Sequence, residues 1–263
     1  MSVVLENKTV LITGASSGIG EHTAYKVASK GANLILCARR WDKLKEVKKV
    51  CEELGSESVL IHPVDIANPD SIDTLLDFLK KQKIQVDVLI NNAGFGHSQS
   101  FMSLDFQIVK DLFFVNVIGL MYLTQQIAIL MLEQPAGQII NVASLAGKVS
   151  TPNYTAYGAT KGAVISFSNA LRLELKPFNI QVTTVNFGPV DTPFFDQIEK
   201  SRRENAENNP FTLTAPAAGA IVTNTIGTKK REINRPLVLA IGTKIYEIMP
   251  SIGDHLLAKY FED

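Results

Sequence analysis

The chain has 263 residues, of which 46% are hydrophobic and 20% charged, a composition typical of a globular protein with a sizeable core. Lys and Arg number 26 together, and so do Asp and Glu, so the formal net charge is zero. This balance argues against a nucleic-acid partner, because attraction to nucleic acid or anionic lipid draws on an excess of positive charge.

Short apolar runs alternate with amphipathic segments over the first two-thirds of the chain. The runs carry Val, Ile and Leu at consecutive positions, which indicates strands buried on both faces of a parallel sheet. The runs are Thr9–Gly14, Asn33–Cys37, Val59–Val64, Val86–Ile90, Gln138–Val142 and Ile180–Val185. The segments with helical periodicity are Ile19–Lys30, Trp41–Leu54, Pro69–Lys83, Leu104–Leu132 and Tyr154–Lys176. This alternation predicts an α/β fold, a doubly wound parallel sheet of about seven strands with helices on both faces.

The alternation of apolar runs and amphipathic segments ends after about Pro189. We expect residues 191–214 to be a loop beside the substrate, Ala215–Gly227 to be a helix, and the basic stretch from Lys229 to Arg235 to be a solvated turn. Residues 237–263 read as a helical extension packed on its own domain, while a cover over the substrate cleft, a partner-subunit contact and a membrane contact stay open as alternatives. No linker or repeat divides the chain, so we predict a single domain over residues 1–263.

Cys37 and Cys51 are the only cysteines in the sequence, and they lack the clustered spacing of a zinc site, so we expect free thiols and no metal. No basic segment followed by an apolar run opens the chain. No stretch reaches the roughly 18 to 20 apolar residues that a bilayer-spanning helix needs. We therefore expect a cytoplasmic protein without a transmembrane segment.

A glycine-rich turn follows the first predicted strand and precedes the first helix, with the sequence Thr-Gly-Ala-Ser-Ser-Gly-Ile-Gly over residues 13–20. Glycine permits positive φ and close approach of a ligand to the backbone. The helix N-terminus that follows offers N–H groups and a positive dipole end to a pyrophosphate. An ordinary tight turn carries glycines as well, but this one lies where a dinucleotide site requires it. We predict cofactor contacts from Gly14, Ser16, Ser17, Gly18, Ile19 and Gly20.

Further motifs follow in order. They are Asn91-Asn92-Ala93-Gly94 after the fourth strand, Asn116 in a long helical segment, Ser144 at the end of the fifth strand, and Tyr157-x-x-x-Lys161. Together with the T-G-x-x-x-G-x-G turn, they resemble the classical short-chain dehydrogenases/reductases over about residues 8 to 192. The resemblance implies a Rossmann fold and an oxidoreductase that interconverts CH–OH and C=O groups with NAD(P). It also implies a homodimer or homotetramer, with two long helical segments, Leu104–Leu132 and Tyr154–Lys176, at the usual dimer interface.

Tyr157 and Lys161 are four residues apart, so on a helix they share one face. A free phenol has a pKa near 10, and a nearby ammonium stabilises the phenolate, so we expect Lys161 to lower the pKa of Tyr157 by about two or three units. Tyr157 would then donate a proton to a carbonyl oxygen, and Ser144 would hydrogen-bond that oxygen as it gains charge. By resemblance, Lys161 also binds the nicotinamide ribose. Asn116 holds a water that links Lys161 to solvent, or else merely distorts its helix.

The end of the second strand favours NADP(H) over NAD(H). Enzymes that use NAD typically carry an acidic residue about 20 residues past the glycines, but Ala38 stands there and Arg39 follows it. A guanidinium binds a 2′-phosphate through charge-assisted hydrogen bonds. We expect Arg40 to stack or to face solvent. As an alternative, both arginines are solvated charges at the start of the next helix. By resemblance, further cofactor contacts come from Asp65 (also readable as a helix-entry turn residue), Ile66, Asn92, Ala93, Gly94, Pro189, Val190 and Thr192.

Apolar and aromatic residues flank the predicted catalytic group, which favours a small-molecule ketone or aldehyde with few charges, or the matching alcohol. These candidate substrate residues are Phe95, His97, Leu145, Tyr154, Phe187, Val190, Phe194 and Phe195. His97 is also readable as an exposed loop residue. A 3-oxoacyl thioester or a sugar/polyol substrate stays open. So does a non-catalytic nucleotide sensor or scaffold, although such relatives typically lack the Tyr or the Lys.

Overall fold

The computed structural model describes residues 5–193 and 210–255. Its main sheet is parallel throughout and has seven strands in the order β3-β2-β1-β4-β5-β6-β9. They are β1 (Thr9–Thr13), β2 (Asn33–Ala38), β3 (Val59–Pro63), β4 (Val88–Asn91), β5 (Gly137–Ser144), β6 (Ile180–Phe187) and β9 (Glu232–Arg235). The predicted doubly wound Rossmann fold is confirmed, and the ends of the six predicted strands differ from the observed ones by at most two residues.

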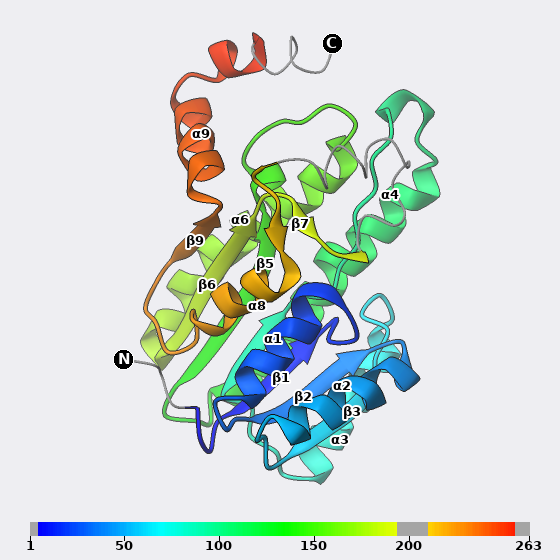
Figure 1. Cartoon of the computed structure of the whole chain (residues 1–263), viewed down its shortest axis with the longest axis vertical. Coiled ribbons are helices and arrows are strands. Elements are labelled where there is room, and N and C mark those ends of the chain that lie inside the picture. The colour runs from blue at the N-terminus through cyan, green and yellow to red at the C-terminus, as the bar shows by residue number, and fades with distance from the viewer. Residues whose placement is uncertain (1–4, 194–209, 256–263) are drawn as a thin grey trace.

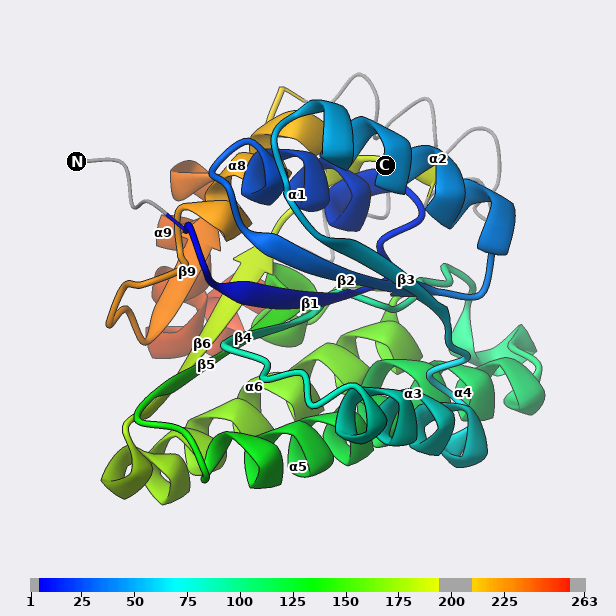
Figure 2. The same cartoon turned by 90° about the horizontal axis from the view of Figure 1, so that it is seen from below.

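Helices cover both faces of the sheet (Figures 1 and 2). They are α1 (Gly18–Ala28), α2 (Trp41–Glu53), α3 (Pro69–Lys81), α4 (Phe106–Phe113), α5 (Leu120–Met131), α6 (Thr155–Leu175), α8 (Ala215–Thr223) and α9 (Leu237–Ile248). In Figure 2, α1, α2 and α8 lie on one face, while α3, α5 and α6 lie on the other. The strands are therefore sandwiched, as their unbroken apolar runs predict.

Two hydrophobic cores result from the alternation of side chains along each strand. In β1, Val10 and Ile12 belong to the core under α1, α2 and α8, whereas Leu11 belongs to the core under α3 and α5. All three side chains are fully buried. Burying a side chain of this size is worth about 2 kcal/mol, so the central strands hold both helical layers to the sheet.

The predicted helix Leu104–Leu132 has a different course. Between α4 and α5, residues Phe114–Gly119 form a π-helical segment. At its end, a Cβ on Gly119 would lie within 1.7 Å of the carbonyl oxygen of Ile66, so only glycine fits there. By length and composition, Phe106–Met131 would suit a membrane span, contrary to the expectation that no stretch would. Half of its most apolar window is buried inside the domain, as in a core helix.

The C-terminal third departs most from the expectations. The basic stretch was expected to be a turn, but it ends in β9, whose residues pair with β6 from Thr184↔Glu232 to Phe187↔Arg235. The expected helix Ala215–Gly227 ends at Thr223. The expected loop 191–214 is bounded by the paired strands β7 (Val190–Asp191) and β8 (Leu213–Thr214).

Residues 256–263 of the expected extension lie outside the described residues, and the helix α9 before them buries little of its surface. In α9 only Thr243 is buried, and large apolar residues such as Ile241, Ile245 and Ile248 are exposed. In Figure 1 this helix extends beyond the sheet from the end of β9.

Candidate active site

One cleft of about 1240 Å³ follows the carboxyl ends of the parallel strands, where doubly wound sheets bind ligands. It begins at Arg39 and Arg40, passes the glycine turn and continues past Ser144 and Tyr157 to α9. The structure therefore brings the predicted cofactor and catalytic residues into one continuous cleft. Among the described candidates, Gly20, His97 and Asn116 do not line it.

The glycine turn has the geometry that close contact with a ligand requires. Gly14 and Gly18 have φ of +66° and +57°, which other residues adopt only with strain. A Cβ at Gly20 would lie 2.3 Å from the carbonyl oxygen of Gly14, so this glycine keeps α1 packed against the turn. No side chain caps α1 at its N-cap residue, Ser17. The first N–H groups of α1 thus face a cleft lined by Ser17, Gly18 and Ile19, an arrangement that fits a pyrophosphate.

Two guanidinium groups lie at the adenosine end of the cleft. Arg40 Nη2 donates to Ser17 Oγ at 2.6 Å and to Ser16 Oγ at 3.0 Å. Arg40 is exposed, and the hydroxyls of the turn also hold it in place. Arg39 is exposed and lines the cleft beside Ala38, where an NAD-binding enzyme would carry its carboxylate. The residues present thus fit a cofactor with a 2′-phosphate.

The loops after β3 and β4 also line the cofactor half of the cleft. Asp65 lines the cleft, and its Oδ1 accepts a hydrogen bond from Ala67 N at 3.0 Å, so turn chemistry and cofactor contact coexist at this residue. Ile66, Asn92, Ala93 and Gly94 line the cleft as well.

Asparagines brace the end of β4. Asn92 Nδ2 donates to Thr13 O at 3.1 Å, which joins the ends of β1 and β4. Asn91 Nδ2 donates to Thr124 Oγ1 at 2.7 Å and to Asn141 Oδ1 at 2.8 Å, which joins β4 to α5 and β5. These buried bonds hold the strand ends on which the site is built.

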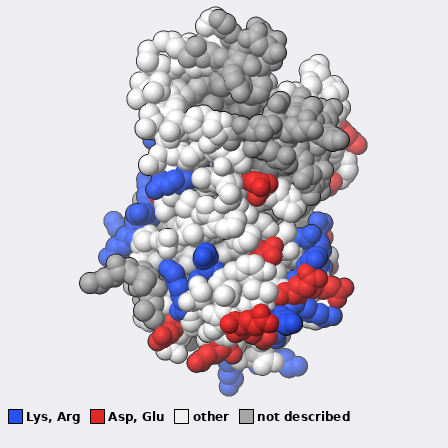
Figure 3. All heavy atoms as spheres, in the orientation of Figure 1, with Lys and Arg blue, Asp and Glu red and all other residues white. Residues whose placement is uncertain are grey.

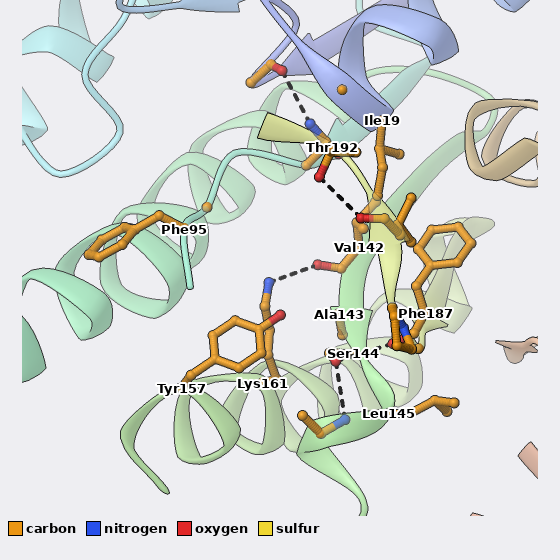
Figure 4. Close-up of a pocket in the computed structure, with 18 of the residues that line it drawn as sticks. Ile19, Phe95, Val142, Ala143, Ser144, Leu145, Tyr157, Lys161, Phe187 and Thr192 are labelled. Atoms are coloured by element: carbon orange, nitrogen blue, oxygen red, sulfur yellow. Dashed lines mark hydrogen bonds between the residues drawn. The ribbon is translucent and has the colours of Figure 1, made fainter. Parts of the chain in front are cut away.

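Ser144, Tyr157 and Lys161 meet at the end of β5 (Figure 4). Ser144 Oγ donates to Phe187 O at 3.1 Å, and its side chain hydrogen-bonds Tyr157. Lys161 Nζ donates to Val142 O at 3.3 Å and lies 5.7 Å from the centroid of the Tyr157 ring. Figure 4 shows Tyr157 and Lys161 side by side on α6, both pointing toward β5.

The protonation of this group differs from the expectation. Burial raises the pKa of Tyr157 to about 12, although the hydrogen bond to Ser144 acts in the opposite direction. Burial also lowers the pKa of Lys161 to about 8. The expected lowering of the Tyr157 pKa is wrong for the protein alone, because withdrawing the phenolate from water outweighs the hydrogen bond to Ser144. Tyr157 therefore holds its proton at neutral pH.

Asn116 lies in the π-helical segment and is almost fully buried. Its Nδ2 donates to Phe95 O at 2.9 Å and to Thr160 Oγ1 at 3.1 Å, and its Oδ1 accepts from Phe95 N at 3.0 Å. A Cβ on Gly94 would lie 2.9 Å from Asn116 Oδ1 and 3.6 Å from Lys161 Nζ, so both side chains converge on this glycine. Local π-helical turns are frequent at functional sites.

The substrate half of the cleft begins beyond Ser144. The cleft lining includes the substrate candidates Phe95, Leu145, Tyr154, Phe187 and Val190, and the cofactor candidates Pro189 and Thr192 line it as well. Phe194 and Phe195 lie outside the described residues. His97 is not brought into the cleft, because its Nε2 lies 3.0 Å from Gln99 Oε1 within its own loop.

The helix α9 lines the far end of the cleft, which agrees with one of the alternatives left open for residues 237–263. Sequence reasoning missed Lys148, whose Nζ lies 2.6 Å from Glu232 Oε1 and 3.5 Å from Glu247 Oε1. A lysine four residues after Ser144 in a loop gives no signal of such burial. The apolar residues of α9 could have signalled a wall, since they recur at helical spacing.

Cys37 lines the cofactor half of the cleft, whereas Cys51 does not line it. Cys37 and Cys51 are buried and unpaired, and burial raises the pKa of each thiol to about 12. Within residues 5–193 and 210–255, no three His, Cys, Asp or Glu side chains gather as a metal site would require.

Comparison with known proteins agrees with this geometry. A family described as short chain dehydrogenase matches residues 8–203. An NADP-dependent 3-hydroxy acid dehydrogenase of Schizosaccharomyces pombe is 35% identical over 215 residues, which are 80% of this chain and 83% of the relative. An 11-beta-hydroxysteroid dehydrogenase-like 3 protein of Arabidopsis thaliana is 40% identical over 188 residues, which are 70% of this chain and 60% of the relative. The closed form of a serine dehydrogenase complexed with NADP+ superposes with a TM-score of 0.80 at 28% identity, covering 88% of this chain and 95% of that one.

Proposed function

Since the chain belongs to the short-chain dehydrogenase family, and is thus an oxidoreductase of alcohol or carbonyl groups that uses NAD(P), we propose that it reduces an uncharged apolar ketone or aldehyde with NADPH. The observation that carries this proposal is the meeting of Ser144, Tyr157 and Lys161 at one end of an apolar cleft. Pairing of a proton donor with an oxyanion-stabilising hydroxyl is what carbonyl reduction needs.

Each residue has a role at a stated atom. When bound, the reduced cofactor supplies a hydride, which is a proton and two electrons, to the carbonyl carbon. The Tyr157 hydroxyl gives its proton to the carbonyl oxygen, so the product is a neutral alcohol. Ser144 Oγ donates to the same oxygen while negative charge develops on it. Lys161 stabilises the tyrosinate left behind, and a solvent proton that reaches Lys161 through a water held by Asn116 restores the hydroxyl.

The raised pKa of Tyr157 supports the reductive direction. A group with a pKa of about 12 enters the reaction protonated at neutral pH, as a proton donor must. Oxidation of an alcohol would need the tyrosinate, which the protein alone disfavours. The positive charge of an oxidised nicotinamide ring would offset that penalty, as the ammonium of Lys161 does in part.

The preference for NADPH rests on the adenosine end of the cleft. Arg39 and Arg40 offer two guanidinium groups where the carboxylate of an NAD-binding enzyme would repel a 2′-phosphate. The fission-yeast relative is described as NADP-dependent, and the serine dehydrogenase structure contains NADP+. Both agree with this assignment.

The choice of an apolar substrate rests on the side chains around the reacting carbonyl. Beyond Ser144 and Tyr157, the described lining contains no Lys or Arg that would pair with a substrate carboxylate, apart from Lys161, which acts in catalysis. Asp111, on α4, is the carboxylate at this end, and it is exposed. A hydroxy acid would therefore lack a counter-ion here. A sensor or scaffold without turnover would leave the Ser144–Tyr157–Lys161 group without a purpose.

The proposal extends to assembly and location. We propose that residues 191–214 border the substrate, as the lining residues Thr192 and Pro193 suggest. We also propose that the protein is a homo-oligomer, since Phe114 and Ile118, between α4 and α5, expose 46% and 47% of their surfaces. For its location we propose the cytoplasm. Size-exclusion chromatography with light scattering would test this assembly, and a monomer at micromolar concentration would contradict it.

The proposed activity is testable by following NADPH and NADH oxidation over a panel of aromatic aldehydes, diketones, ketosteroids, 3-oxoacyl thioesters, sugars and hydroxy acids. Turnover of apolar carbonyl compounds with NADPH, weaker with NADH and lost in Tyr157→Phe, is the expected result. Preferred turnover of a hydroxy acid or a sugar would overturn the substrate assignment. Tight NADPH binding with no turnover of any compound would favour a sensor.

A further inference from the structure

The helix α9 forms a wall of the cleft beyond the catalytic residues. Val238, Leu239, Gly242, Tyr246 and Met249 all line it, and none of them carries a charge. Figure 3 shows mostly uncharged surface where α9 lies, whereas Lys, Arg, Asp and Glu gather over the lower part of that face. An uncharged wall this close to a reacting centre is suited to the apolar part of a substrate.

This wall is tied to the catalytic residues. Gly188 follows β6, and a Cβ on it would lie 2.8 Å from Leu239 Cδ1, so α9 approaches the backbone closely there. Gly188 N also donates to Arg235 O at 2.8 Å. Because Phe187 O accepts the Ser144 hydroxyl, the base of α9 lies next to the strand that positions Ser144.

Ion pairs reinforce the attachment. The side chain of Lys148 is only 8% exposed, and it pairs with Glu232 on β9 and with the more exposed Glu247 on α9. Hydrogen bonds from Lys148 and Asn234 keep the pKa of Glu232 below its usual range, although burial alone would raise it. The segment after Ser144 is thus joined to the wall by ion pairs.

The wall is long and apolar along its length. Val238 and Met249 are eleven residues apart, which corresponds to about 16 Å along an α-helix. Other uncharged residues, Leu145, Val149 and Tyr154, line the cleft as well. In the protein alone, Val238 and Met249 expose 59% and 48% of their surfaces. Covering such surface with an apolar chain stabilises the complex by removing it from water.

We propose that α9 makes the enzyme selective for elongated, uncharged carbonyl compounds, whose apolar chain lies along α9 while the carbonyl meets Ser144 and Tyr157. This inference rests on the proposed function and adds the class of substrate to it. Each methylene that the wall buries would raise kcat/KM by about fourfold, until the chain passes the end of the wall. Short or charged carbonyl compounds gain nothing from the wall.

The test uses the homologous ketones 2-butanone, 2-hexanone, 2-octanone and 2-decanone with NADPH. For the wild type, we expect kcat/KM to rise steeply with chain length. In Gly242→Trp we expect the ratio of kcat/KM for 2-decanone to that for 2-butanone to fall at least tenfold. A Cβ at Gly242 meets nothing within 4 Å, so this position accepts a side chain, and we expect the indole to occupy the cleft beside α9.

The matched control is Ile241→Trp at the neighbouring position. Ile241 is 62% exposed and does not line the cleft, so this variant should keep the chain-length dependence. Val238→Asp is a second variant that needs no large side chain, and it should depress kcat/KM more for 2-decanone than for 2-butanone. Thermal melting of each variant separates a loss of fold from a loss of selectivity.

The outcomes separate the two proposals. Turnover of every ketone without dependence on chain length, or an equal effect of Gly242→Trp and Ile241→Trp on the ratio, would overturn the role of α9 and leave the proposed function standing. No NADPH oxidation with any carbonyl compound, including aromatic aldehydes, would overturn the proposed function itself and this inference with it.

Discussion

Replacing Lys161 by Met should stabilise the folded chain while it abolishes turnover. Lys161 is 6% exposed, and burial lowers its pKa from 10.5 to about 8, which corresponds to a penalty of about 3 kcal/mol for holding the ammonium at pH 7. The variant also loses the hydrogen bond to Val142 O, worth about 1 kcal/mol. A net gain of about 2 kcal/mol in the free energy of unfolding is therefore expected, since Met fills a similar apolar volume.

The pH dependence follows from the direction of the shift. Between pH 8 and 10.5 the unfolded chain binds the proton that folded Lys161 has released, so this residue makes the wild type more stable as pH rises through that range. Below pH 8 both states are protonated, and the penalty is fully present. The advantage of Lys161→Met should thus be largest at neutral pH and should shrink toward pH 10.5.

Urea unfolding at pH 7 and at pH 9.5, followed by circular dichroism, measures both effects. The matched control is Lys148→Met, which removes a buried lysine that has partners. Since Glu232 would lose its ion pair at 2.6 Å, we expect that variant to be less stable than the wild type by about 2 kcal/mol or more. If Lys161→Met were destabilised as much as Lys148→Met at both pH values, this would refute the claim that the buried ammonium of Lys161 destabilises the folded chain.

Three further predictions concern the cofactor half of the cleft and the two buried cysteines. Arg39→Asp should lower kcat/KM for NADPH by about 100-fold and raise it for NADH, because a carboxylate would replace a charge-assisted partner of the 2′-phosphate; an unchanged NADPH/NADH ratio in steady-state kinetics would contradict this role. Gly14→Ala should weaken NADPH binding in a fluorescence titration and lower the free energy of unfolding by about 1 to 3 kcal/mol, since φ is +66° and the new Cβ would lie 2.9 Å from Ala93 Cα; wild-type affinity and stability would show that the turn relaxes. Cys37 and Cys51 should resist a thiol-specific reagent at pH 8 until the protein is unfolded, because burial raises both pKa values to about 12; rapid labelling of the folded protein would show that these residues are accessible.

The central sheet was predictable because its strands are buried on both faces. Runs such as Thr9–Thr13 leave no polar face, and this pattern separates a sandwiched parallel strand from most alternatives. The seventh strand has the opposite character. Glu232–Arg235 is polar, lies at the sheet edge and pairs only with β6, so its sequence resembles a turn. Pairing along one side compensates for a composition that local propensity does not favour.

Sequence motifs located the residues that meet at the end of β5, because their spacing along strand and helix fixes where they lie. Protonation was not predictable in the same way. The pKa of Tyr157 depends on how much water reaches the phenol, and burial at that point comes from residues far away in the sequence. The same reason conceals Lys148, whose importance comes from partners on β9 and α9.

The most direct test of the central claim follows a single deuterium. NADPH carrying deuterium at both C4 positions of the nicotinamide would be incubated with the enzyme and 2-octanone in ordinary water, and the alcohol would be analysed by mass spectrometry. We predict one deuterium on the carbinol carbon with the wild type and no labelled alcohol above background with Tyr157→Phe. Unlabelled alcohol from the wild type, or equal labelled alcohol from Tyr157→Phe, would contradict hydride transfer assisted by this tyrosine.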